Sequence, residues 1–242
     1  EEGLFACAEL ASGRVAEPNE DNCSRFEAIT GLDYRDLAKL GEATRHYADE
    51  WPDMILDFSV LYDDPLYCAN YRNYLVRKPS ETKDRRFYCA KHKTKEWRDD
   101  GRAVMAEHRR VLAECENLAN VPGAAKALVK VLGAKLDYQA AILEVWKKKD
   151  RVALAKIAFE DVPRLAKLMD DFCRKYRHDW YLTSLPFGFE RIQKRNAAQY
   201  ERILEVERRL AAYLSGEAST VEELDEAMDD FGRYSPVFPI GW

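Results

Sequence analysis

Apolar residues recur every three or four positions over long stretches of this chain, between about residue 104 and residue 214. An α-helix turns once in about 3.6 residues, so this spacing gathers apolar side chains on one helix face. The stripes occupy 104–119, 128–146, 152–176 and 192–214. Glycine and proline, which interrupt helices, number only 11 and 9 among 242 residues. Long amphipathic helices joined by short breaks predict an all-α fold, a multi-helix bundle.

Two prolines mark the expected breaks between these helices. Pro122 is followed by glycine and ends the first stripe, so the next helix is expected to run to about Lys149. Pro163 lies inside the stripe that begins at Val152 and includes Phe159. Either it kinks one long helix, or Asp161 caps a new helix with Pro163 in its first turn. We favour the second, because the acidic pair Glu160-Asp161 lies just ahead of the proline, with only Val162 between them.

The N-terminal part of the chain predicts short helices with tight connections. Asp21 or Asn22 can cap a helix over 23–30, and Gly31 is expected to end it in a left-handed conformation. Asp33 is expected to cap the next short helix.

Charge and cysteine content exclude several classes of protein. The formal net charge is −5, whereas a nucleic-acid-binding domain normally carries a basic face. No apolar run reaches the roughly 18 residues of a membrane span. The six cysteines are scattered, without metal-type pairs or the density of a disulfide scaffold. We expect reduced thiols in a cytoplasmic protein, with no nucleic-acid or membrane partner.

Adjacent carboxylates at Asp49-Glu50 are the most tempting catalytic pair, since two such groups can orient a substrate and donate a proton. In a barrel enzyme they would follow a β-strand, but residues 43–48 do not read as one. A solvated helix end is the better interpretation. Cys89-x-x-His92 offers two ligands where structural zinc needs four. The four histidines are too separated for a local metal motif: His46, His92, His108 and His178. We therefore expect no catalytic residue, no metal site and no cofactor.

A basic stretch with interleaved aromatic residues lies between Lys83 and Arg98. It could bind an anion or a nucleic acid, but a solvated helix face with its aromatic side chains buried is the more usual explanation.

Four segments carry a resemblance to a known family. They are Trp180, the run Leu-Pro-Phe-Gly-Phe-Glu at 185–190, the run Tyr-Leu-Ser-Gly-Glu at 213–217, and Leu-Tyr-Asp-Asp-Pro-Leu at 61–66. In their order along the chain, these segments resemble the C-terminal helical domain of bacterial family 20 glycoside hydrolases, the β-N-acetylhexosaminidases. Residues 4–10 and 25–33 resemble the end of that family's (β/α)8 catalytic barrel. The resemblance therefore implies a barrel remnant at 1–45 and a helical domain at 46–242.

In that family the substrate's acetamido oxygen attacks the anomeric carbon, while an Asp-Glu pair orients the amide and protonates the leaving oxygen. The resemblance places this pair and its barrel upstream of Glu1. It implies a supporting domain in carbohydrate metabolism, whose partner is the barrel of the same polypeptide and which can support a homodimer. Trp180 and Glu190 are the candidates for lying close to substrate. The alternative is a free-standing helical interaction module without enzymatic activity.

The chain departs from the family pattern beside the specific turn. Ser184-Leu185 replaces an asparagine-lysine pair, and paired glycines are missing around 194–198. Without a barrel, the apolar face of Leu4, Phe5 and Leu10 is expected to lose its cover.

Overall fold

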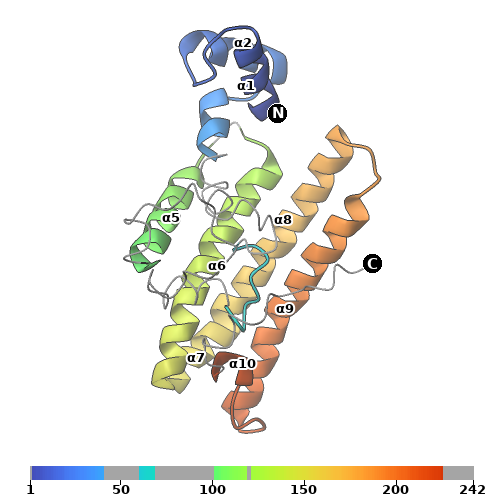
Figure 1. Ribbon diagram of the computed structural model, residues 1–242. Helices are drawn as coiled ribbons and strands as arrows, with labels where there is room; N and C mark the ends of the chain where they lie inside the picture. The colour runs from blue at the N-terminus through green and yellow to red at the C-terminus, as the bar shows by residue number, and fades with distance from the viewer. Residues whose placement is uncertain (1, 41–59, 69–100, 119–120, 226–242) are drawn as a thin grey trace, which may run out of the picture.

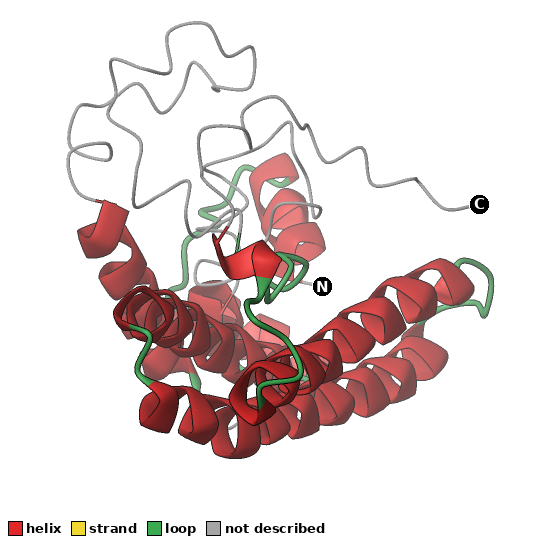
Figure 2. Ribbon diagram, turned by 90° about the horizontal axis from the view of Figure 1, so that it is seen from below, coloured by secondary structure: helices red, strands yellow, loops and turns green. Residues whose placement is uncertain are grey.

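The computed structural model describes residues 2–40, 60–68, 101–118 and 121–225. Its central element is α6 (Gly123–Lys148), which packs against α5 (Gly101–Cys115) and α8 (Val162–Thr183). Helix α8 also packs against α9 (Phe189–Ser215). Figure 1 shows these four helices beside one another. Figure 2 draws only helices and loops in the described residues, which confirms the all-α class.

Shorter helices lie at the two ends of this bundle. The chain begins with α1 and α2 and a helical segment at 34–40, and α10 lies at the opposite end (Figure 1). Their bounds are α1 Glu2–Ala11, α2 Glu20–Thr30, α7 Arg151–Lys156, the π-helical η4 Ile157–Asp161, and α10 Glu222–Asp225.

Most expected helix ends are confirmed, and one cap is corrected. Gly31 ends α2 with a φ of 71°, a left-handed conformation that suits glycine. The N-cap of α2 is Asn19 rather than Asp21 or Asn22: its Oδ1 accepts from the Asn22 amide at 3.0 Å, and Asn22 Oδ1 accepts from the Asn19 amide at 2.8 Å. The helix begins earlier because this reciprocal pair satisfies two amides. Asp33 caps 34–40 as expected.

The prediction for Pro163 is half right. Pro163 lies in the first turn of α8, but Asp161 has helical dihedral angles and its side chain caps nothing. The cap is Asp150, whose Oδ1 accepts from the amides of Val152 and Ala153, both at 3.1 Å. From there α7, η4 and α8 follow one another without a break. A π-helical turn loosens the i→i−4 ladder, so the proline ring is accommodated without ending the helix.

Around the same π-helical turn, the expected apolar stripe is wrong at two positions. Val152 is 83% exposed and Phe159 is 54% exposed, so neither lies in the core. Leu154, Ile157 and Ala158 are buried in their place. A π-turn holds one residue more than an α-turn, which shifts the helix face on either side of it. The stripe from Val162 to Phe172, beyond the turn, faces the core as predicted.

The N-terminal helices share the bundle's hydrophobic core. The ring of Phe5 packs on those of Phe26 and Tyr34, with centroids 5.0 and 5.1 Å away. The expected open face is therefore wrong for Phe5, whereas Leu10 is 62% exposed, and the Leu4 side chain lies outside the described part. The domain boundary at 45–46 also falls outside it and stays a prediction.

Several chain segments meet at one end of the bundle. Asp179 Oδ2, near the end of α8, accepts from the Ala124 amide at the start of α6 at 2.9 Å. Lys39 Nζ lies 3.1 Å from the Glu114 carboxylate at the end of α5. The loop between α8 and α9 and the N-terminal helices therefore lie at the same end (Figure 1).

The opposite end is closed around Trp146 of α6. Its Nε1 donates to Asp225 Oδ1 at 2.8 Å, and its ring meets that of Tyr213 edge-on at 4.9 Å. Gly216 ends α9 with a φ of 85°, so the chain can turn back and bring α10 against α6. None of the described helices has the length and hydropathy that a membrane-crossing helix requires.

Candidate functional site

A lysine is buried between α6 and α9. Lys135 is 1% exposed, and its Nζ donates to the carbonyl of Leu61 at 2.8 Å, to the carbonyl of Asp63, and to Gln199 Oε1 at 3.1 Å. An ammonium group has three donors, and here each one has an acceptor. Because a buried cation without such partners would be strongly unfavourable, this geometry is a specific feature of the fold.

Leu61 and Asp63 belong to a turn at residues 60–68, and further polar side chains donate hydrogen bonds to this turn. Gln139, one turn after Lys135, donates from Nε2 to Asp63 Oδ2 at 2.6 Å. Gln199 donates to the carbonyl of Tyr62 at 3.1 Å, and the Tyr138 hydroxyl donates to the carbonyl of Pro65 at 2.8 Å. We call this set the polar anchor: Lys135, Tyr138, Gln139 and Gln199, with the turn 60–68.

Asp64 organises the turn from within. Its Oδ1 accepts from the amides of Leu66 and Tyr67 at 2.9 and 3.0 Å, and Arg202 of α9 grips both carboxylate oxygens at 2.7 and 3.2 Å. Burial opposes ionisation of this carboxyl, but the bonds from Arg202 and from the Tyr67 amide outweigh it and lower the pKa of Asp64. These bonds hold the shape of the turn 60–68.

Burial also changes the pKa of Lys135. It lowers the pKa of the ammonium group from 10.5 to about 8, and the nearby Asp63 carboxylate opposes this change. Lys135 stays protonated at neutral pH, enclosed and fully engaged with the backbone of the turn. Such a group cannot reach a substrate, so the polar anchor joins the turn to α6 and α9 rather than carrying out chemistry.

The two predicted substrate-proximal residues both lie at the α8–α9 turn. Trp180 is half-buried, and its Nε1 donates to the carbonyl of Leu185 at 2.9 Å. Glu190 is exposed, and its Oε2 accepts from the Gly188 amide at 2.9 Å. Gly188 has a φ of 92°, which a residue with a Cβ rarely adopts. The buried ring of Phe189 lies 5.8 Å from that of Trp180. The structure thus brings both residues to one turn, where they hold its shape.

Four large apolar side chains of this turn point outward. Tyr181 is 50% exposed, Leu182 71%, Leu185 74% and Phe187 84%. We call these four residues the apolar tip. From the sequence, the aromatic residues at this corner can either form a platform for a sugar or, more commonly, lie in the core. The exposure of Tyr181 and Phe187 shows that these two do not lie in the core.

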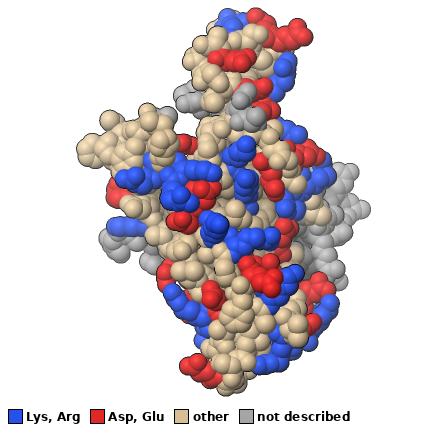
Figure 3. All heavy atoms as spheres, turned by 180° about the vertical axis from the view of Figure 1, so that it is seen from behind, with Lys and Arg blue, Asp and Glu red and all other residues tan. Residues whose placement is uncertain are grey.

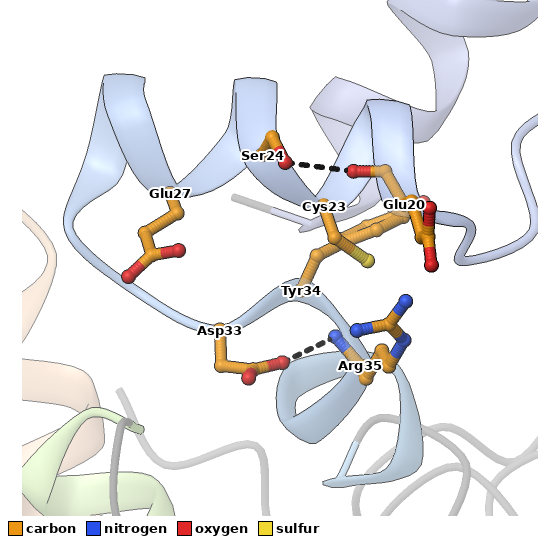
Figure 4. A pocket seen from close by; sticks show the side chains of 7 residues that line it. All are labelled: Glu20, Cys23, Ser24, Glu27, Asp33, Tyr34 and Arg35. Carbon is orange, nitrogen blue, oxygen red and sulfur yellow. Dashed lines mark hydrogen bonds between the residues drawn. The ribbon is translucent and has the colours of Figure 1, made fainter.

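A cleft of about 300 Å³ lies between α2 and the segment 34–40 (Figure 4). Its polar groups are largely engaged in local structure: the Ser24 hydroxyl donates to the carbonyl of Glu20 at 2.8 Å, and the Asp33 carboxylate accepts from the Arg35 amide at 2.8 Å. The cleft is open to solvent on one side and makes a poor catalytic pocket.

Several candidates from the sequence lie outside the described residues. These are Asp49-Glu50, Cys89, His46, His92 and the basic stretch 83–98, together with the side chain of His108. His178 is exposed on α8. Within the part of the chain that the structure describes, no group of His, Cys, Asp and Glu side chains is placed to hold a metal ion, and the cysteines form no disulfide.

The polar anchor was not predicted as a site, although its residues carry a signal. Lys135 and Gln139 are four residues apart on a helix, on the face that also carries Leu132 and Ile142. Polar residues on an apolar face indicate a buried network, but only the fold shows that their acceptors lie more than 70 residues earlier in the chain.

Comparison with known families gives one match. Residues 60–236 match the model of the Glycoside Hydrolase 20C C-terminal domain, which covers well over half of the chain. The match begins at the turn that the polar anchor holds. No curated protein matches the chain.

Proposed function

Because this chain belongs to the Glycoside Hydrolase 20C C-terminal domain family, we propose that it is the supporting domain of an enzyme that removes terminal β-linked N-acetylhexosamine. The family name describes a C-terminal domain, which implies a catalytic domain in the same polypeptide. We propose that the catalytic Asp-Glu pair belongs to that domain, and that the present chain is not catalytic by itself.

The hydrogen-bond partners of the buried ionisable side chains support a non-catalytic role. The buried ionisable side chains of the described residues include Glu9, Asp63 and Lys135. Glu9 accepts from Arg14 and Arg25, and Lys135 binds the backbone of the turn. Catalytic groups need contact with a reacting atom, whereas these groups join one segment of the chain to another. Such bonds are typical of a scaffold.

We propose that the α8–α9 turn is the part of this domain that approaches substrate, with Trp180 and Glu190 as the substrate-proximal residues. One carboxylate oxygen of Glu190 binds the Gly188 amide, and the side chain is exposed. A carboxylate of this kind can accept hydrogen bonds from sugar hydroxyls.

Conservative variants of the whole enzyme test this role. Glu190→Gln keeps one acceptor oxygen and removes the charge, and Trp180→Phe keeps a ring and removes the N–H donor. We expect each to raise KM for a β-N-acetylglucosaminide about threefold to tenfold with kcat retained, because remote binding contacts act on affinity. Unchanged KM and kcat in both variants would rule out contact with substrate.

Hydrolysis of a chromogenic β-N-acetylglucosaminide tests the proposed function itself. The purified 242-residue chain is assayed beside the full polypeptide that includes the catalytic domain. Activity in the full polypeptide alone is the expected result. Activity in the shorter chain would contradict the non-catalytic role, and activity in neither would favour a free-standing interaction module. We also propose a cytoplasmic location, supported by the five cysteines of the described residues, which form no disulfide.

A further inference from the structure

The apolar tip is an exposed and rigid surface. Its four side chains are exposed by between 50% and 84% within seven consecutive residues, 181–187. The bond from Trp180 Nε1 to the Leu185 carbonyl spans the turn, and the ring of Phe189 packs against those of Trp180 and Tyr181 at 5.8 and 5.4 Å. Preorganised apolar surface binds a partner with little loss of conformational entropy.

No tip side chain carries a charge, and the nearest charged groups lie at its edge: Arg177 over the ring of Tyr181, at 5.2 Å from its centroid, and Glu190 on the Gly188 amide. Figure 3 shows the projecting end of the α8–α9 hairpin as an uncharged lobe, with Lys, Arg, Asp and Glu gathered over the helices below it. Soluble proteins rarely expose contiguous apolar patches, and those that do use them for interaction. Single exposed residues such as Val152 need no such explanation.

The position of the tip indicates its partner. The tip lies at the end of the bundle where Asp179 binds the start of α6 and Lys39 binds the end of α5. The N-terminal helices lie at that end as well (Figure 1). Residues 1–59 precede the region that matches the family. In a polypeptide whose C-terminal domain begins near residue 60, the preceding catalytic domain connects through this end.

We propose that the apolar tip docks onto the catalytic domain of the same polypeptide, against an uncharged apolar surface. This inference rests on the proposed function, because it needs a catalytic domain in the chain. It differs from substrate contact by Trp180 and Glu190, since it assigns the outward side chains of the turn to an interface between domains.

Hydrogen exchange in two proteins tests the docking. Amides of residues 181–189 are followed in the 242-residue chain and in the full polypeptide. Docking predicts exchange roughly tenfold slower in the full polypeptide, because a covered turn opens less often. In the full polypeptide, Leu185→Ser with Phe187→Ser returns these amides to the faster rate. Val152→Ser, which changes an equally exposed apolar residue on α7, leaves them protected.

Three results would overturn the proposal, and each has its own signature. Equal exchange in both proteins means that the tip stays exposed beside the catalytic domain. Protection that rises with protein concentration means that a second copy of the chain covers the tip. A full polypeptide without a glycoside hydrolase catalytic domain refutes the proposed function, and the docking with it. The three substituted positions are all exposed, so both variants of the full polypeptide are expected to fold.

Discussion

Replacing Lys135 by methionine removes the central donor of the polar anchor while keeping most of its buried aliphatic stem. Three oxygens then lose their donor: the carbonyls of Leu61 and Asp63, and Gln199 Oε1. A buried acceptor left without a partner costs about 1–3 kcal/mol, so three of them give at least about 3 kcal/mol. The Asp63 carboxylate, which is 4% exposed, also loses a neighbouring positive charge. Removing one member of a buried charged network costs about 3–5 kcal/mol, which we take as the expected loss.

Urea unfolding followed by circular dichroism at pH 7 measures this loss as a change in the free energy of unfolding. Lys148→Met, on the same helix, is the matched control. Its Nζ pairs with Glu144 at 2.6 Å, but the side chain is 65% exposed, so solvent screens the pair and the loss should be much smaller than that of Lys135→Met. A loss below about 1 kcal/mol for Lys135→Met, or an equal loss in the control, would refute the anchoring role of Lys135.

Three more predictions follow from local geometry. Burial lowers the pKa of Lys135 from 10.5, the ordinary value that applies in the unfolded chain, to about 8 in the folded protein. Between pH 8 and pH 10.5 the unfolded chain therefore binds one more proton than the folded protein, so the free energy of unfolding rises with pH. The free-energy gap between wild type and Lys135→Met should widen by about 1–2 kcal/mol from pH 8 to pH 10, and a constant gap would contradict the shift. Asp150→Ala should lose about 1 kcal/mol in urea unfolding and Asp161→Ala less than about 0.5, because only Asp150 caps a helix; equal losses would contradict the capping assignment. Gly188→Ala should lower the free energy of unfolding by about 1 kcal/mol, because alanine is strained at a φ of 92°. No atom lies within 4 Å of the added Cβ, so a clash adds nothing to this loss; an unchanged free energy would contradict the strain.

The long helices and their glycine ends could be predicted because local rules determine them. Gly31 ends α2 and the break at Pro122 precedes α6, since both depend on neighbouring residues alone. Phe159 was misplaced because a π-helical turn shifts the helix face, and no residue in the stripe signals that turn. Asn19 was missed as a cap because Asp21 and Asn22, which follow it closely, are also residues that commonly cap helices.

The candidate site was predicted only in part. Trp180 and Glu190 were predicted through a family resemblance; the structure places them at one turn, and their contact with substrate stays a prediction. Lys135 was missed as a site because its three partners, Leu61, Asp63 and Gln199, are 74, 72 and 64 residues away in the chain. The composition of a helix face shows that a polar residue will be buried, but only the tertiary fold shows what it binds.

The proposed role of this domain is to support a hexosaminidase without taking part in its chemistry. The most direct test is kcat and thermal inactivation of the full polypeptide carrying Lys135→Met, compared with wild type on a chromogenic β-N-acetylglucosaminide. A supporting role predicts kcat within about twofold of wild type at a temperature where both are folded. It also predicts a fall of about 5–15 °C in the inactivation midpoint. A hundredfold loss of kcat in the folded variant would contradict the claim.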